Sequence, residues 1–408
     1  MVWPHSTGKG VVVAVIDSGV RATHVDLRGQ VLEGKDFAFG GDGQTDHSPE
    51  GHGTQMASLI AGHGHGPNGD DGIMGLAPGA KILPVGIGTG VLGQGPYVVP
   101  QAIRYAVDHG AQVVSMSFGI GSPNPVEESA VAYAEQHNVV LVAASGNDGT
   151  SEKQYPASWP GVIKVGAVDK TGKLTQESQT GGVTVVAPGA DIVSDTNGSD
   201  TQMFMGHGTS DSTAYVAAIA ALYRSAHPNL TAGQIVNYII KTAIPPQGIT
   251  TPDPGYGYGI ASPDLTMAVS PGPASGPLPQ ATDPLKSSGS ASGGSSRNDT
   301  ASSSSSSSSM GIIIGVLGGL VVLVIIVVVL VRNRRGGGGG GNGGAGGGNG
   351  GQPAYAAQPQ AYQPPTGQYG GQSPYGQPPQ QPNPYGGGNQ QYPPQQNPYG
   401  GRGGRCRG

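Results

Sequence analysis

The sequence predicts an α/β domain in which a parallel β-sheet lies between two layers of helices. Short, continuously apolar runs rich in valine and isoleucine are typical of strands that are buried on both faces. These runs alternate along the chain with segments of helical pattern, as in repeated strand–helix–strand units. The first part of the chain, to about Leu265, is long enough to bury one large core.

The predicted elements follow one another through this part of the chain. The strands cover residues 10–16, 81–85, 112–116, 139–143 and 162–165, and the helices cover residues 54–61, 97–109 and 126–137. A further, strongly apolar helix follows Ser210. Active sites collect at the carboxyl ends of the strands in such sheets, so polar residues there are the first candidates for chemistry.

Three polar residues stand at the ends of these elements. Asp17 directly follows the first strand, His52 opens a helix between two glycines, and Ser210 precedes the most apolar helix. Taken singly, they are explained as a turn residue, a cap or metal ligand, and an N-cap. A serine at a helix start also gains from the helix dipole and from free backbone N–H groups, which favours a nucleophile there.

Five blocks of sequence resemble the subtilisin-like serine proteases, the subtilases. In chain order they are VAVIDSGV, GHGTQMASLIAG, VVSMSFG, VVLVAASGNDG and GHGTS followed by YVAAIAAL. They lie within about residues 8–265, two-thirds of the chain, and the order Asp, His, Ser is that of subtilisin. The resemblance implies a subtilisin-like three-layer fold and an endopeptidase that works through an acyl-enzyme.

The resemblance also assigns roles to individual residues. Asp17, His52 and Ser210 would form the catalytic triad. The side-chain amide of Asn147 and the backbone N–H of Ser210 would form the oxyanion hole. An extended substrate would pair as an added strand with one segment of the domain and with a glycine-rich loop on its other side. The residues expected to bind it are Ser115, Ser117, Phe118 and Gly119 in the segment and Gly93 and Gly95 in the loop.

Other histidines and acidic residues offer alternatives. GHGT occurs twice, so His207 is the rival of His52, but it lies only three positions before the nucleophile and is poorly placed as its base. His63 and His65 lie in a loop rich in Gly, Asn and Asp, and Asp26 resembles a calcium ligand of the family. The chemistry requires no cofactor and we expect no metal among the site residues, while a structural calcium ion near this loop stays open.

Two residues after the predicted nucleophile depart from the family pattern. Relatives usually carry an apolar residue and later a proline where this chain has Asp211 and Ala214. Ala214 is harmless, because proline is allowed but not required in the first turn of a helix. The Asp211 carboxylate is favourable at a helix N-terminus, yet it opposes the charge of an oxyanion. If this side chain faces solvent, we expect only a modest loss of rate.

The C-terminal third has a different composition. An uncharged apolar run begins at Gly311 and ends at Val331, long enough to cross a lipid bilayer as a helix. A cluster of arginines lies only on the C-terminal side of this run. Because positively charged flanks favour the cytoplasmic side of the membrane, we expect the tail in the cytoplasm and the catalytic domain outside the cell. The predicted parts are a peptidase domain (1–269), a Pro/Ser/Gly-rich flexible linker (270–309), a transmembrane helix (310–332) and a disordered Gly/Gln/Pro/Tyr-rich tail (333–408).

An extracellular domain requires a signal peptide, yet none precedes the strand at residue 10. We therefore expect a natural start upstream of Met1, or a processed form. The one cysteine, Cys406, allows no intrachain disulfide. The net charge of −5 does not favour a nucleic-acid partner.

Within the subtilases, the layout resembles the mycosins, membrane-anchored proteases of actinobacterial type VII secretion systems. The similarity rests on WPHSTGKGV before the Asp block, the stalk, the single span and the short basic stop. It implies processing of secreted proteins at a type VII membrane complex. The alternative is a catalytically weak scaffold that stabilises such a complex, and a binding role of the tail is a third hypothesis.

Overall fold

The computed structural model describes residues 2–89 and 97–287. Gly93, Gly95, the apolar run from Gly311 to Val331 and the tail lie outside these residues. Within the described residues, no helix is long and apolar enough to cross a membrane.

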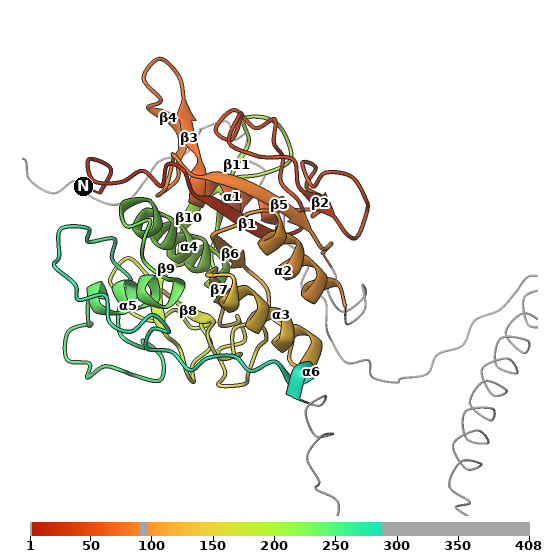
Figure 1. The fold of residues 1–408 in the computed structure, drawn as a ribbon. Helices are drawn as coiled ribbons and strands as arrows, with labels where there is room; N and C mark the ends of the chain where they lie inside the picture. The colour runs from red at the N-terminus through yellow and green to blue at the C-terminus, as the bar shows by residue number, and fades with distance from the viewer. Residues whose placement is uncertain (1, 90–96, 288–408) are drawn as a thin grey trace, which may run out of the picture. The chain divides into compact units, whose positions relative to one another are not determined.

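A parallel sheet forms the centre of the domain, with seven described strands in the order β2-β5-β1-β6-β7-β8-β9 (Figure 1). These strands are β1 (Val12–Asp17), β2 (Lys35–Asp36), β5 (Lys81–Gly86), β6 (Val113–Met116), β7 (Val140–Ala144), β8 (Ile163–Val168) and β9 (Val185–Pro188). Two antiparallel hairpins lie outside this sheet: β3 (His63–His65) with β4 (Asp71–Met74), and β10 (Ile192–Asp195) with β11 (Met203–Gly206).

Helices cover both faces of the sheet. One core cluster contains α2 (Val98–Asp108) and α3 (Pro125–Gln136), and the other contains α1 (His52–Ala61), α4 (Thr209–Ala226) and α5 (Ala232–Thr242). Side chains of β1 alternate between the clusters, with Val13 and Val15 in the second and Ala14 and Ile16 in the first. Successive side chains of a strand point to opposite faces, so this alternation confirms the predicted three-layer α/β architecture.

The sequence did not predict every element. The predicted strands and helices are all present, but β2, β9, the two hairpins, α5 and the short helix α6 (Pro284–Ser287) were missed. Hairpin β10–β11 has no continuous buried run, since Met203 and Met205 are exposed. Helix α5 does carry a local signal, a capping box between Thr231 and Gln234.

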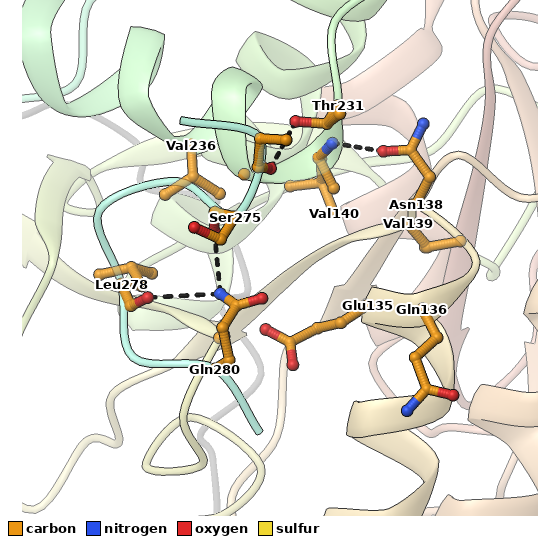
Figure 2. A pocket seen from close by; sticks show the side chains of 14 residues that line it. Glu135, Gln136, Asn138, Val139, Val140, Thr231, Val236, Ser275, Leu278 and Gln280 are labelled. Carbon is orange, nitrogen blue, oxygen red and sulfur yellow. Dashed lines mark hydrogen bonds between the residues drawn. The ribbon is translucent and has the colours of Figure 1, made fainter. Parts of the chain in front are cut away.

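Residues 270–287, the first part of the predicted linker, lie along the outer helices and end in the short helix α6 (Pro284–Ser287). Asn237 Nδ2 donates to the carbonyl of Ser270 at 2.8 Å, and the backbone N–H of Ala281 donates to Glu135 Oε2 at 2.8 Å. Figure 2 shows a cavity between this segment, α3 and α5, and it contains none of the predicted site residues. The domain division at residue 270 stays a prediction, to which the structure adds this packed segment.

Candidate active site

The predicted site residues gather at the carboxyl edge of the sheet. Asp17 ends β1, Ser117 directly follows β6, and Asn147 follows β7. Ile16 of β1 lies level with Met116 of β6, so these strands end at the same height. Helices α1 and α4 begin at this edge, which is where the βα connections of a parallel sheet place functional side chains.

The Asp17 carboxylate holds the ring of His52. Nδ1 of His52 lies 2.9 Å from Oδ1 and 3.0 Å from Oδ2 of Asp17. An ionised carboxylate can only accept hydrogen bonds, so Nδ1 donates and Nε2 is left as the acceptor. Asp17 Oδ1 also accepts from the backbone N–H of Ser18 at 2.8 Å. This tautomer is the one that a general base requires.

The start of α1, and with it His52, is fixed by side chains from other segments. The N-cap residue Gly51 has a positive φ of 71° and provides no side-chain cap. The backbone N–H groups of residues 52–54 instead donate to Ser48 Oγ (2.7 Å), Ser18 Oγ (3.0 Å) and Asp46 Oδ2 (2.8 Å). These N–H groups have no partner inside the helix. Sequence analysis missed all three acceptors, because no local spacing shows that they converge.

Asn147 is oriented by the residue that precedes the predicted nucleophile. Its Oδ1 accepts from both the backbone N–H and the hydroxyl of Thr209, each at 2.9 Å. This leaves Nδ2 of Asn147 as a donor beside the start of α4. Gly208 has a φ of 143°, and a Cβ there would lie 3.2 Å from Nδ2. Together with the first-turn N–H of Ser210, this is the donor arrangement that an oxyanion hole needs.

The hydroxyl of Ser210 donates to the carbonyl of Ser117 at 3.2 Å, and Ser117 Oγ donates to the carbonyl of Ser210 at 3.1 Å. Among the hydrogen bonds of the described residues, none joins Ser210 to His52. The Ser210 hydroxyl must therefore leave Ser117 before His52 can take its proton. Catalytic hydrogen bonds often form only when substrate is bound.

Two cavities meet at Glu50 and His52. The first, of about 250 Å³, is lined by Asp17, Ser18, Ser48, Ile87, Gly88, Thr89, Ser117 and Phe118 as well. The second, of about 290 Å³, is also lined by Gln55, Met56, Asn147, Phe204, Met205, Gly206, His207, Ser210 and Asp211. Ser210 and Asn147 thus share one cavity with His52.

The residues predicted to bind substrate fall into two groups. Ser117 and Phe118 line the first cavity, and Gly119 follows them and is exposed. Ser115 is only 1% exposed and lies inside β6, paired with β1 on one side and β7 on the other. Both edges of its backbone are therefore already paired, and Ser115 lines neither of the two cavities.

The alternative histidines have other surroundings. His207 is exposed in the loop before α4, and no hydrogen bond of the described residues joins it to Asp17. His63 contacts backbone carbonyls through both ring nitrogens. His65 Nδ1 lies 2.6 Å from Asp26 Oδ1.

Asp211 does not face solvent, so the condition under which the sequence predicted a modest loss of rate is not met. Its residue is 3% exposed, because the first turn of α4 is enclosed by the sheet and by the loops around it. Burial raises the pKa of Asp211 to about 6, although the charges of His52 and His207 act in the opposite direction. Asp211 is one of the residues that line the cavity of Ser210 and His52.

The pKa of His52 reflects these carboxylates. Burial by itself lowers this pKa, but the charge and hydrogen bond of Asp17, followed by the charges of Asp211 and Asp46, raise it to about 9. The raised pKa of His52 shifts the neutral ring, whose Nε2 is the acceptor, toward higher pH. Only the neutral ring can act as a general base.

Comparison with known proteins identifies the family. Residues 8–259 match the profile of the Subtilase family, Peptidase S8. The chain is a subtilase. Fervidolysin of Fervidobacterium pennivorans is 36% identical to this subtilase over 307 residues, which cover 68% of the chain and 42% of fervidolysin. A thermophilic serine proteinase of Bacillus sp. strain AK1 is 40% identical over 232 residues, 55% of this chain and 54% of that protein. The subtilase thus spans about half the length of these two relatives.

Solved structures resemble the described fold. The crystal structure of MycP1 with its N-terminal propeptide removed is 30% identical, with a TM-score of 0.58, and the match covers 67% of this subtilase and 96% of MycP1. The MycP3 protease from the type VII (ESX-3) secretion system is 31% identical, with a TM-score of 0.56, and the match covers 64% of this chain and 84% of MycP3. These similarities confirm the subtilisin-like fold and the resemblance to mycosins.

In this subtilase, replacing Asp211 by asparagine is expected to move the acid limb of the kcat/KM profile to lower pH. A carboxylate near His52 favours the imidazolium and raises its pKa, so removing that charge lowers the pKa. With His52 as the predicted general base, only its neutral form supports kcat/KM. Each unit by which the pKa of His52 decreases then raises kcat/KM about tenfold, at pH values below the pKa of both proteins. The measurement is kcat/KM for a chromogenic peptide as a function of pH.

The matched control for Asp211→Asn is Asp108→Asn. Asp108 is exposed at the end of α2, on the other face of the sheet. It should leave the profile in place. An acid limb that is unchanged in Asp211→Asn would show that the Asp211 carboxylate does not act on His52.

Proposed function

We propose that this subtilase is a serine endopeptidase whose triad is Asp17, His52 and Ser210. The observation that carries the proposal is the contact of His52 Nδ1 with both Asp17 oxygens, beside a cavity that His52 shares with Ser210 and Asn147. The pair of Asp17 and His52 would not by itself specify hydrolysis, and neither would Ser210 with Asn147. A base, its orienting carboxylate, a hydroxyl and an amide donor in one place together support it.

In the proposed mechanism, His52 Nε2 takes the hydroxyl proton of Ser210 as Oγ attacks the peptide carbonyl. Asp17 stabilises the imidazolium, and Asn147 Nδ2 with the Ser210 N–H binds the oxyanion. His52 then gives the proton to the leaving amine, which breaks the C–N bond and leaves an acyl-enzyme. A water molecule, deprotonated by His52, releases the acid and restores Ser210.

The proposed substrate is an extended polypeptide. Ser117 and Gly119 would pair with its backbone, with Phe118 beside it and with Gly93 and Gly95 on its other side. Recognition through the backbone supports cleavage within chains and modest selectivity for side chains.

We also propose that the protein is anchored in the cell membrane through the run from Gly311 to Val331. The peptidase domain (1–269) would be extracellular and the tail (333–408) would be cytoplasmic. The linker predicted for residues 270–309 would join the domain to the membrane, with its first part, to residue 287, packed on the domain. The one-sided arginines after the run support this orientation. The chain resembles MycP1 and MycP3, and MycP3 is a protease from the type VII (ESX-3) secretion system. This resemblance supports the processing of secreted proteins at such a complex.

The test is labelling of the purified protein with a fluorophosphonate probe over a series of increasing pH values, since the neutral base is favoured at higher pH. The probe is then located by mass spectrometry of peptides. We expect a stoichiometric adduct on Ser210 and none on Ser212, the buried serine two positions later. A folded protein that gains no adduct, or gains it at another residue, would contradict the proposed nucleophile.

A catalytically weak scaffold is the second candidate function. The presence of Asp211 among the residues that line the cavity and the bond of the Ser210 hydroxyl to Ser117 favour it. It predicts that a Ser210→Ala strain behaves like the wild type while a deletion strain does not.

A further inference from the structure

We propose that His24, Asp26 and Asp195 form a buried binding site for a divalent transition-metal ion of the zinc type. All three residues are 0% exposed. One ligand atom of each lies within 4.8 Å of the others, so a single ion can reach all three after small side-chain movements. His24 and Asp26 follow β1, whereas Asp195 ends β10, so the site joins two distant segments.

The hydrogen bonds of His24 indicate that Nδ1 carries a lone pair, since the backbone N–H of Asp26 donates to it over a long 3.4 Å. Nε2 lies 3.2 Å from the carbonyl of Gln202, and a carbonyl can only accept, so Nε2 carries a hydrogen. In the neutral ring, Nδ1 then presents a lone pair, and it lies 3.2 Å from Asp195 Oδ2. Metal-binding histidines typically donate their other N–H to a backbone carbonyl in this way.

Asp195 provides the second, independent observation. Both of its carboxylate oxygens are fully buried and accept no hydrogen bond. A lone pair on His24 facing such a carboxylate is unfavourable unless a cation lies between them. The Asp26 carboxylate adds a second negative charge at the same place, so a divalent ion would balance both acids while one proton on His24 would balance only one.

The donor set selects the kind of ion. Calcium is bound by six to eight oxygens, whereas zinc accepts imidazole nitrogen together with carboxylate oxygen and needs about four ligands. Asp26 is held in place by the backbone N–H of Ile73 at 2.8 Å and by His65 Nδ1 at 2.6 Å. Such outer contacts orient metal ligands. For the set of His24, Asp26 and Asp195 we therefore propose a zinc-type ion, while the expectation of calcium near this loop stays a prediction.

The site would also brace the segment that positions His52. Directly after Asp195, Thr196 Oγ1 donates to the carbonyl of Glu50 at 2.6 Å, and Asn197 Nδ2 donates to the carbonyl of Ser48 at 2.7 Å. Ser48 in turn accepts from the backbone N–H of His52. A bound ion would fix the start of this chain of contacts.

The test uses the untagged full-length protein, depleted of metal by a chelator and then titrated with zinc chloride. We expect one bound zinc per chain by elemental analysis. Zinc at about a hundredfold excess over Kd should raise the thermal midpoint by about 5–10 °C. Asp195→Asn and His24→Gln should each lose the ion and the increase. His137→Gln, which changes an exposed histidine at the end of α3, should retain both.

Three outcomes would overturn the proposal. The first is a midpoint that zinc does not change in the wild type, which would mean that a proton alone occupies the site. The second is an increase with calcium but not with zinc. The third is full zinc retention in a folded Asp195→Asn variant. Should that variant fail to fold, the wild-type titration and the His24→Gln variant still decide the question.

Discussion

Replacing Ser210 by alanine is expected to lower kcat for a chromogenic peptide by about 10⁵–10⁶-fold with little change in KM. The lower rate follows because no hydroxyl remains to attack the carbonyl, while the surfaces that hold the peptide are unchanged. Subtilisin, a member of the same family, is the reference for this magnitude. Residual turnover would reflect the oxyanion hole and substrate binding alone.

The control for Ser210→Ala is Ser225→Ala in the last turn of the same helix, where Oγ donates to the carbonyl of Lys9. It should retain the wild-type rate. If Ser210→Ala kept a substantial share of the activity, the nucleophile would be another residue, and the proposed mechanism would be wrong.

Replacing Asp17 by asparagine is expected to lower kcat by about 10⁴-fold. The asparagine amide can donate to Nδ1 of His52, which favours the tautomer with hydrogen on Nε2, and that nitrogen then cannot accept the Ser210 proton. The change also removes the charge that raises the pKa of His52. The remaining activity should therefore have its acid limb at lower pH than the wild type.

The measurement for Asp17→Asn is kcat and KM across a pH series, with Asp36→Asn as the control. Asp36 is also a buried aspartate that ends a strand of the sheet, but its Oδ1 accepts from the backbone N–H groups of residues 38 and 39. That control should keep most of its activity. A decrease of less than about tenfold in Asp17→Asn would show that Asp17 does not orient the base.

The residues that bear strong local signals could be predicted from the sequence. Val13 and Val15 lie in a β-branched run that only a buried strand explains, and glycine-flanked His52 and Ser210 stand at helix starts. Each signal depends on a few consecutive residues, so it is readable without knowing what packs against them. The fold class and the candidates Asp17, His52, Ser210 and Asn147 came from such signals and from the family resemblance that they carry.

Other features were decided only by the tertiary structure. Asp211 is buried because α4 enters the core, and Ser115 is enclosed because β6 has a strand on each side. Asp195 meets His24 and Asp26 because hairpin β10–β11 packs beside the segment after β1. Exposure and long-range proximity depend on how loops of irregular backbone bring distant elements together. Loops lack the regular spacing of apolar residues that predicts helices and strands, so their paths cannot be predicted from the sequence. The sequence determined which chemical groups are present, and packing determined which of them meet and which face water.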